Sequence, residues 1–308
     1  MRISIIIPSH NAGRWVSHAI ESALAQTWPE TEVIVVDDAS SDDSVAKIRT
    51  FGDRVRFLQG VWHNGNAARN AGLAAATGEW VQFLDADDYL ESQKITWQFS
   101  ETDDLASADV LYSPVLVETW CNGRPANREP TCIDTGTDIF TQWFTWQLPQ
   151  TGSALWRREA LLRIGGWKDG QPCCQEHELY LRALQTALRF RFCPTPGAVY
   201  RIWSEETVCR KDPLLVIREK TKLIDAALAW LTVHDRLSPA HRDAAGQACF
   251  GMARTWAKSD LSKAASYAGE RRRLRRFLPR GPAAPPCYRL ALALCGFRFA
   301  ECIARWTR

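Results

Sequence analysis

Short apolar runs, each of strand length and each ended by polar or turn-forming residues, dominate the first 90 residues of this chain. They cover residues 3–7, 32–36, 55–58 and 80–84. A short apolar run bounded by turn residues is typical of a strand buried on both faces, as in a parallel sheet. Segments of helical spacing or small residues separate the runs, at 15–25, 42–50 and 66–76. This alternation predicts an open α/β sheet with flanking helices.

Three polar clusters follow the predicted strands, at residues 8–11, 37–38 and 85–88. In open α/β sheets ligands bind beyond the carboxyl ends of the strands, so we expect the three clusters to converge. Asp85, Asp87 and Asp88 end the fourth strand. Hard divalent cations such as Mg²⁺ or Mn²⁺ take oxygen ligands, usually one or two carboxylates with phosphate oxygens and water. The sequence therefore predicts a metal site here, although Asp88 is equally suited to cap the following helix.

Five blocks in fixed order resemble the family 2 glycosyltransferases of the GT-A fold. They read SIIIPSHN (4–11), VVDDASSD (35–42), NGNAARNAG (64–72), TGEWVQFLDADD (77–88), and LWRR (155–158) followed by IGGW (164–167). The resemblance covers about residues 1–205. It implies an α/β catalytic domain of GT-A type over 1–212, with an open mixed sheet. Its nucleotide-sugar half would span about 1–112 and its acceptor half about 113–212, followed by a helical region at 213–308.

The resemblance also implies roles on the nucleotide side. The aspartate at the position of Asp38 contacts the base, typically uracil, and the backbone around Pro8, Ser9 and His10 lines the base pocket. Asp37 instead holds the turn. Arg69 is expected near the base or the diphosphate, where a guanidinium suits bidentate contacts. The alternative for Arg69 is a surface pair with Asp42 or Asp38.

Asp87 is expected to bind the metal, with Asp85 contacting the ribose, the metal or a metal-bound water. Arg201 lies in a Tyr-Arg pair that resembles the family's closing block. It would hold the diphosphate or pair with Glu205 or Glu206. The cofactor implied is Mn²⁺ or Mg²⁺.

Residues 175–182 read QEHELYLR, which resembles the family block E-D-x-D-L-W-L-R. The second acidic residue of that block deprotonates the acceptor hydroxyl, and Glu176 occupies its position here. The match departs twice, since Gln replaces the first Glu and Glu replaces Asp. His177 and Glu178 are alternative bases. Positions 176 and 178 lie about 200° apart on a helix, so only one of them can face the site. Both carboxylates also favour a helix N-terminus without any catalytic role.

The segment between residues 113 and 175 is rich in tryptophan and is where acceptor recognition is expected. Trp143 and Trp146 are candidates to stack on a sugar. They are three residues apart and would share one helix face, so packing in a core is the competing interpretation.

The C-terminal third changes to helical spacing, over residues 214–231 and 243–257. Residues 271–308 hold ten arginines and one glutamate, although the whole chain has a net charge of only +3. Residues 288–306 are mostly apolar but interrupted by charge, which makes a poor spanning helix. A basic amphipathic helix on an anionic membrane surface is predicted, with docking on the acidic catalytic domain or on a second subunit as the alternative. No stacking platform accompanies the tail, so nucleic acid is not an expected partner.

The resemblance implies an inverting, metal-dependent glycosyltransferase that moves a sugar from a nucleoside-diphosphate sugar to a glycan or lipid-linked acceptor of the cell surface. UDP-sugars are the family's commonest donors. The departures at Gln175 and Glu176 keep a non-catalytic nucleotide-sugar-binding subunit open as the alternative. The chain starts directly with strand one, without a signal-peptide pattern, and its ten cysteines lack metal spacing. We expect a cytoplasmic protein at the inner face of the plasma membrane, with homo-oligomers open.

Overall fold

The computed structural model describes residues 1–203, 212–275, 279–280 and 284–306. These residues form two compact units. The first consists of Met1–Gly136 with Gln147–Glu206, and the second of Thr137–Trp146 with Thr207–Arg308. The predicted change to helices after residue 212 is thus accompanied by one short earlier segment, 137–146, which belongs to the second unit.

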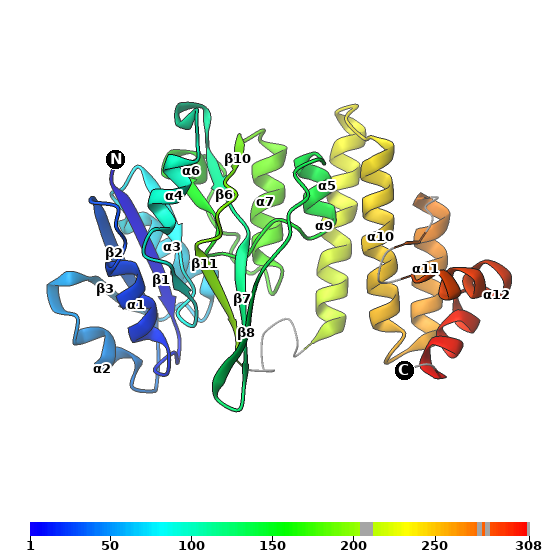
Figure 1. Cartoon of the computed structure of the whole chain (residues 1–308), viewed down its shortest axis with the longest axis horizontal. Helices are drawn as coiled ribbons and strands as arrows, with labels where there is room; N and C mark the ends of the chain where they lie inside the picture. The colour runs from blue at the N-terminus through cyan, green and yellow to red at the C-terminus, as the bar shows by residue number, and fades with distance from the viewer. Residues whose placement is uncertain (204–211, 276–278, 281–283, 307–308) are drawn as a thin grey trace. The chain divides into compact units, whose positions relative to one another are not determined.

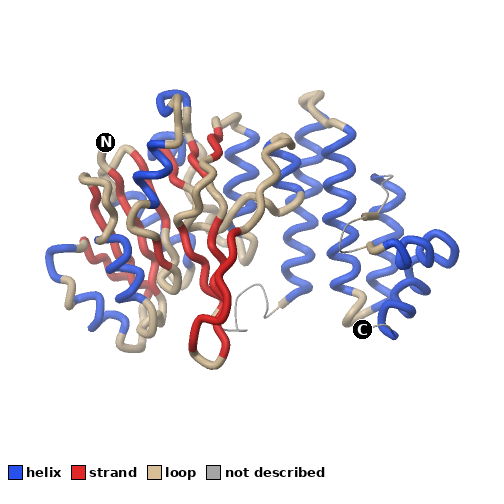
Figure 2. Tube along the Cα trace, in the orientation of Figure 1, coloured by secondary structure: helices blue, strands red, loops and turns tan. Residues whose placement is uncertain are grey.

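A seven-stranded sheet forms the centre of the first unit (Figure 2). Its strands follow in the order β10 (Phe190–Phe192), β6 (Val110–Tyr112), β9 (Leu155–Arg157), β4 (Trp80–Phe83), β1 (Ile3–Ser9), β2 (Thr31–Asp38) and β3 (Arg56–Gly60). β1 pairs in parallel with β2 and β4, whereas β9 runs antiparallel to β4 and β6. The predicted open mixed α/β sheet is confirmed.

Helices cover both faces of this sheet. They are α1 (Val16–Leu24), α2 (Ser44–Arg49), α3 (Gly65–Ala75), α4 (Lys94–Ser100), α6 (Arg158–Arg163) and α7 (Gln175–Gln185), with 3₁₀ turns at Gly52–Arg54 and Leu105–Ser107. Every residue of β1 is buried, which explains its nearly continuous apolar run. Ile5 and Ile7 join a core with residues of α1 and α2. On the other face α3 lies so close that a Cβ on Gly72 would stand 2.4 Å from Ile6.

A second sheet places its strands in the order β5 (Tyr89–Leu90), β11 (Ala198–Ile202), β7 (Val115–Cys121) and β8 (Arg124–Pro130). β5 directly follows the acidic residues 85–88, so these residues connect the two sheets. Asp88 therefore caps no helix. Its Oδ1 instead accepts a 2.8 Å hydrogen bond from the backbone N–H of Arg201 on β11.

The second unit is helical. It contains α5 (Ile139–Phe144), α9 (Pro213–Val233), α10 (Pro239–Trp256), α11 (Leu261–Arg275) and α12 (Pro286–Trp306). α10 packs against α5, α9 and α11, as Figure 1 shows for α9 to α11. α12 is kinked at Gly296, whose φ is +80°. In the described part of the chain, no helix has the length and apolar character needed to cross a bilayer.

Charges of the C-terminal tail find partners within this helical unit. Arg271 Nη1 lies 2.6 Å from Asp225 Oδ1, and Glu301 Oε1 lies 2.6 Å from Arg254 Nε. Arg280 also pairs with Asp243. Part of the tail's charge thus contributes to packing, which the arginine count alone does not reveal.

Candidate active site

The acidic residues that follow β4 form the centre of the site. Asp88 is buried, and burial together with the charges of Asp87 and Asp85 raises the pKa of Asp88 well above its usual range. Burial, and then the Asp85 carboxylate, also raise the pKa of Asp87. Crowded carboxylates of this kind resist ionisation unless a cation shares the space. The donor set fits a hard divalent cation, because such ions need only one or two protein carboxylates when a diphosphate supplies the other oxygens.

No cluster of three or more His, Cys, Asp or Glu side chains is arranged to hold a metal among the residues the structure describes. Asp87 Oδ2 accepts a 3.0 Å hydrogen bond from the indole Nε1 of Trp203. Asp87 and Asp85 are the side chains that would hold the cation, and its binding would replace the indole contact.

Arg69 holds Asp85. Its Nη2 donates to Asp85 Oδ1 at 2.6 Å, and its guanidinium carbon lies 4.7 Å from the centre of the Trp167 ring. The Arg69 side chain is only 9% exposed, whereas that of Asp85 is 27% exposed, so water reaches this pair from the carboxylate side. The alternative of a surface pair with Asp42 or Asp38 is wrong, because α3 directs Arg69 toward the end of β4. The arginine orders one of the two carboxylates expected at the metal.

Asp38 holds the loop that leads into α3. Its Oδ1 accepts from the backbone N–H groups of Trp62 and His63 at 2.6 and 2.8 Å, and its Oδ2 accepts from that of Asn64 at 2.9 Å. Burial raises the pKa of Asp38, but these three donors outweigh it and hold the pKa below its usual range. A carboxylate has about four acceptor positions, so one position on Asp38 stays available to a further donor.

The backbone of β1 ends beside Asp38. His10 Nδ1 lies 2.6 Å from the carbonyl oxygen of Asp38. Ser9 is buried, and Pro8 and Ser9 stand in register with Val36 and Asp37 of β2. Asp37 Oδ2 accepts from the N–H of Ser40 at 3.2 Å, which agrees with its expected role in holding the turn. The structure thus brings the first two polar clusters together.

Arg201 lies under the acidic loop. Its Nη1 donates to the backbone carbonyl of Asp87 at 2.9 Å, and its Nε stands 3.6 Å from Glu118 Oε1. The guanidinium carbon lies 4.5 Å from the ring centre of Trp15 and 4.4 Å from that of Tyr89. With 2% of its side chain exposed, Arg201 supports the acidic loop from the protein interior. The alternative partners Glu205 and Glu206 lie outside the described residues.

His18 completes the surroundings of Arg201. Burial, and then the nearby Arg201 charge, lower the pKa of His18. A neutral imidazole can accept a hydrogen bond at one ring nitrogen, and Arg201 Nη2 contacts His18 Nδ1. The geometry therefore fits a donor–acceptor pair between the two side chains.

The first turn of α7 separates the three candidate bases. Glu178 is 7% exposed and accepts from Arg182 Nε and Nη2 at 2.8 and 2.7 Å. Glu176 is half-buried, and its Oε1 accepts a 2.8 Å hydrogen bond from the hydroxyl of Thr151. Gln150 and Gly152, on either side of Thr151, line the same small cavity as Asp88. Glu176 thus contacts a segment that borders Asp88, while Glu178 pairs with Arg182.

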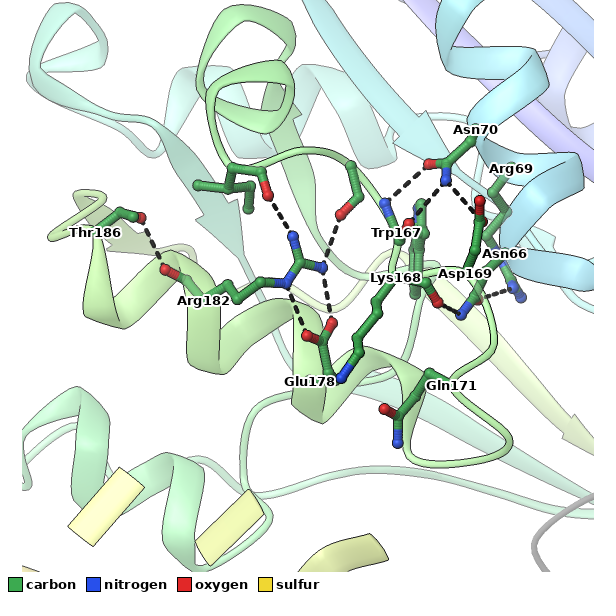
Figure 3. A network of polar contacts seen from close by, with 12 residues as sticks. Asn66, Arg69, Asn70, Trp167, Lys168, Asp169, Gln171, Glu178, Arg182 and Thr186 are labelled. Carbon is green, nitrogen blue, oxygen red and sulfur yellow. Dashed lines mark hydrogen bonds and ion pairs between the residues drawn. The ribbon is translucent and has the colours of Figure 1, made fainter. Parts of the chain in front are cut away.

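α3 and α7 are joined by the loop around Trp167 (Figure 3). The Asn70 side chain donates to the carbonyl of Trp167 at 2.7 Å and accepts from its N–H at 2.9 Å. Asn66 donates to the carbonyl of Lys168 at 2.8 Å, and Arg182 donates to that of Gly166 at 2.7 Å. The helix that carries Arg69 and the helix that carries Glu176 are thus fixed through one loop.

Cys174 sets the start of α7. It precedes the helix in the left-handed conformation, with a φ of +57°, which costs about 1 kcal/mol or more for a residue other than glycine. The resulting turn determines which way the first-turn side chains point. His177 lies in the same turn and is half-buried.

The two acceptor candidates belong to the helical unit. α5 ends at Phe144, so Trp146 lies beyond the helix with a φ of +60°, and the expectation that both residues share a helix face is wrong. Trp143 is fully buried, with its ring 5.1 Å from that of Phe144 and 6.1 Å from that of Trp146. This placement corresponds to the packing interpretation for Trp143, and the acceptor role remains a prediction.

Sequence reasoning missed several residues that shape the site. Thr151 contacts Glu176, and Trp203 contacts Asp87. Glu118 pairs with Arg201. None lies next to its partner in the sequence. Trp167 could have been found, since it stands in one of the blocks that carry the resemblance.

Comparisons with known proteins agree with this geometry. The model of the family described as "Glycosyl transferase family 2" matches residues 4–163, more than half of the chain. The chain belongs to glycosyltransferase family 2. The GT-A fold and the family predicted from the sequence are therefore confirmed.

Among curated relatives, the Escherichia coli protein named UDP-Glc:alpha-D-GlcNAc-diphosphoundecaprenol beta-1,3-glucosyltransferase WfgD is 41% identical over 100 residues. These residues make up 32% of this chain and 40% of that protein. The chain spans about half the length, or less, of such curated relatives.

Two solved structures share the fold. Staphylococcus aureus TarS 1–349, in complex with UDP-GlcNAc, superposes with a TM-score of 0.70 at 16% identity, covering 100% of this chain and 93% of that one. The mannosyltransferase PcManGT from Pyrobaculum calidifontis, in complex with GDP-Man and Mn²⁺, gives a TM-score of 0.56 at 16% identity, covering 99% and 87%.

Proposed function

We propose that this family 2 glycosyltransferase moves a sugar from a UDP-sugar to an acceptor hydroxyl, with inversion, in the synthesis of a cell-surface polysaccharide or glycolipid. One observation carries the proposal. The acidic loop is anchored by Arg69, Arg201 and Trp203, while the partner of Glu176 among the described residues is a neutral hydroxyl. The site thus has aspartates in fixed positions for the donor, and the Glu176 carboxylate is available to the acceptor.

Asp38 is the proposed contact of the base. Its remaining acceptor position suits an imide N–H such as that of uracil, and Pro8, Ser9 and His10 supply the adjoining backbone. UDP appears in the names of both the TarS complex and the E. coli relative. The PcManGT complex holds GDP-Man, so GDP- and dTDP-sugars belong in any donor test.

Asp87, with Asp85, is proposed to hold Mn²⁺ or Mg²⁺ against the diphosphate. When bound, the cation supplies Lewis-acid stabilisation of the charge that develops on the leaving nucleoside diphosphate. Arg69 keeps Asp85 oriented, and the backbone contact of Arg201 keeps the Asp87 carbonyl in place. PcManGT was solved with Mn²⁺, which supports a divalent ion without naming it for this chain.

Glu176 is proposed to accept the proton of the attacking hydroxyl. General-base assistance of this kind contributes about 10²–10⁴-fold to the rate. The Thr151 hydroxyl binds one oxygen of this carboxylate and leaves the other oxygen to face the acceptor. We further propose that residues 1–112 serve the donor and 113–212 the acceptor.

The acceptor is proposed to be glycan or lipid-linked, as in the name of the E. coli relative, which would place the enzyme at the inner face of the membrane. Both halves of α12 expose large apolar side chains, at 62% and 74% for Leu290 and Leu294 and at 51% and 42% for Phe299 and Ile303. An apolar face beside arginines suits an anionic lipid surface. Flotation with phosphatidylglycerol vesicles tests this membrane attachment. Leu294→Glu should weaken binding to the vesicles. Val233→Glu, at a similarly exposed position on α9, should not.

A non-catalytic nucleotide-sugar-binding subunit remains the second candidate, because the base block departs from the family twice. Nucleoside-diphosphate release from a panel of UDP-, dTDP- and GDP-sugars, with and without Mn²⁺, separates the two. We expect metal-dependent release from one donor, abolished in Asp87→Ala and strongly reduced in Glu176→Gln. Nucleotide binding by calorimetry without release from any donor, in the presence of lipid-linked acceptor, would support the binding subunit.

A further inference from the structure

A groove of about 510 Å³ lies within the helical unit, between the end of α5 and one face each of α9 and α10. Val216, Ile217 and Met252 line it with apolar side chains. Its volume falls in the range of small-molecule sites, about 300–1,000 Å³. None of the roles proposed for the first unit uses this groove.

A cation and an indole stand at one wall of the groove. The ammonium of Lys220 lies 3.8 Å from the ring centre of Trp146. Trp146 adopts a φ of +60°, an unusual conformation for a bulky residue, which costs about 1–3 kcal/mol and persists where the surroundings impose it. The backbone thus holds the ring against the groove rather than letting α5 continue.

Gly251 lies in the middle of α10 and lines the groove. Glycine inside a helix costs about 1 kcal/mol relative to alanine. Packing does not require it, because a Cβ added to Gly251 would meet no atom within 4 Å. A side chain here would project into open space, so the glycine keeps the groove open.

We propose that this groove binds the phosphate-bearing end of an isoprenyl or alkyl chain, the lipid part of the acceptor. The apolar residues of α9 and α10 contact the chain, and Lys220 pairs with the phosphate. Charge complementarity favours this occupant, since a largely apolar groove whose described lining carries one cation, Lys220, matches an amphiphile with one anionic head. The inference rests on the proposed lipid-linked acceptor, and it assigns that lipid a site in the helical unit.

Calorimetric titration of the full chain with farnesyl phosphate, without any donor, tests the assignment. We expect farnesyl phosphate to bind, farnesol to bind about tenfold more weakly, and inorganic phosphate not to bind measurably. Lys220→Gln should lower the affinity for farnesyl phosphate about tenfold and leave that for farnesol unchanged. Gly251→Leu fills the groove and should weaken both ligands at least tenfold, with a melting temperature equal to or above that of the parent.

Gly269→Leu in α11 is the matched control, because a Cβ added there also meets no atom within 4 Å and the position lines a different groove. It should leave both affinities unchanged. Unchanged affinity in Gly251→Leu, or equal affinity of Lys220→Gln and the parent for farnesyl phosphate, would overturn the assignment. Binding of a soluble chito-oligosaccharide in place of farnesyl phosphate would do the same. Donor hydrolysis by the same variants reports separately on the proposed transferase function.

Discussion

Glu176 and Glu178 should separate cleanly into a catalytic and a structural carboxylate. Glu178→Gln removes one of two charged hydrogen bonds to Arg182, whose own side chain is 25% exposed while that of Glu178 is 7% exposed. Breaking a fully buried pair costs about 3–5 kcal/mol. Because the arginine is partly solvated and glutamine keeps one acceptor, we expect a loss of about 2 kcal/mol, or about 4–8 °C in melting temperature.

Glu176→Gln should behave in the opposite way. The amide oxygen of glutamine can still accept from the Thr151 hydroxyl, so the variant loses at most about 0.5–1 kcal/mol and the fold should be nearly unaffected. The turnover number should fall by about 10²–10⁴-fold, because an amide cannot accept the acceptor's proton.

Two measurements on purified protein distinguish the pair: denaturant unfolding, and turnover at saturating donor and acceptor. Glu159→Gln is the control, since Glu159 is an exposed acidic residue in the first turn of α6, and neither quantity should change. The reasoning is refuted if Glu178→Gln abolishes turnover in a fully stable protein while Glu176→Gln turns over normally. That result would transfer the role of base to Glu178.

Three further outcomes follow from buried charges. Arg69→Lys keeps the charge, but a lysine side chain cannot both stack on Trp167 and reach Asp85, so kcat/KM for the donor should fall at least about tenfold. An unchanged kcat/KM would show that Asp85 needs no arginine. Asp38→Asn leaves at least one loop N–H unsatisfied and should lower the free energy of unfolding by about 2 kcal/mol at pH 7. Because the folded pKa of Asp38 lies below its unfolded value, this contribution is complete above about pH 4 and is lost as the pH falls further, so parent and variant should converge in acid. Burial lowers the pKa of Lys94 to about 7, so above that pH the unfolded chain holds a proton that the folded chain lacks. The free energy of unfolding should therefore rise with pH from about 7 to about 10. Lys94→Met should flatten this rise. A profile that is identical in the parent and the methionine variant would contradict a neutral lysine.

The strands and the polar clusters at their ends were predictable because both are local patterns. An apolar run of strand length needs burial wherever it is, and β1 and β4 were buried as expected. The carboxyl ends of parallel strands meet at one edge, so Asp38 and the aspartates after β4 were expected near each other. The helices of the C-terminal third followed from spacing in the same way.

Partner choice was not predictable, because it depends on residues far apart in the chain. Arg69 pairs with Asp85 rather than with Asp38 or Asp42, since the approach of α3 to the sheet at Gly72 sets its direction. Arg201 was expected at the diphosphate, and 113 residues separate it from Asp88, whose carboxylate accepts from its N–H. Its side chain is turned inward by Trp15 and Tyr89.

The sequence by itself determined which segments become strands and helices, and which chemical groups end the strands, because hydrophobic period and turn residues act over a few positions. Only the tertiary structure decided which carboxylate is structural and which is available. Glu176 and Glu178 are equivalent by composition. The sequence offers Glu178 a partner one helical turn further along, Arg182, but only the fold places the Gly166 carbonyl against that arginine and Thr151 against Glu176. These two contacts arise from packing between distant segments, and no local pattern encodes them.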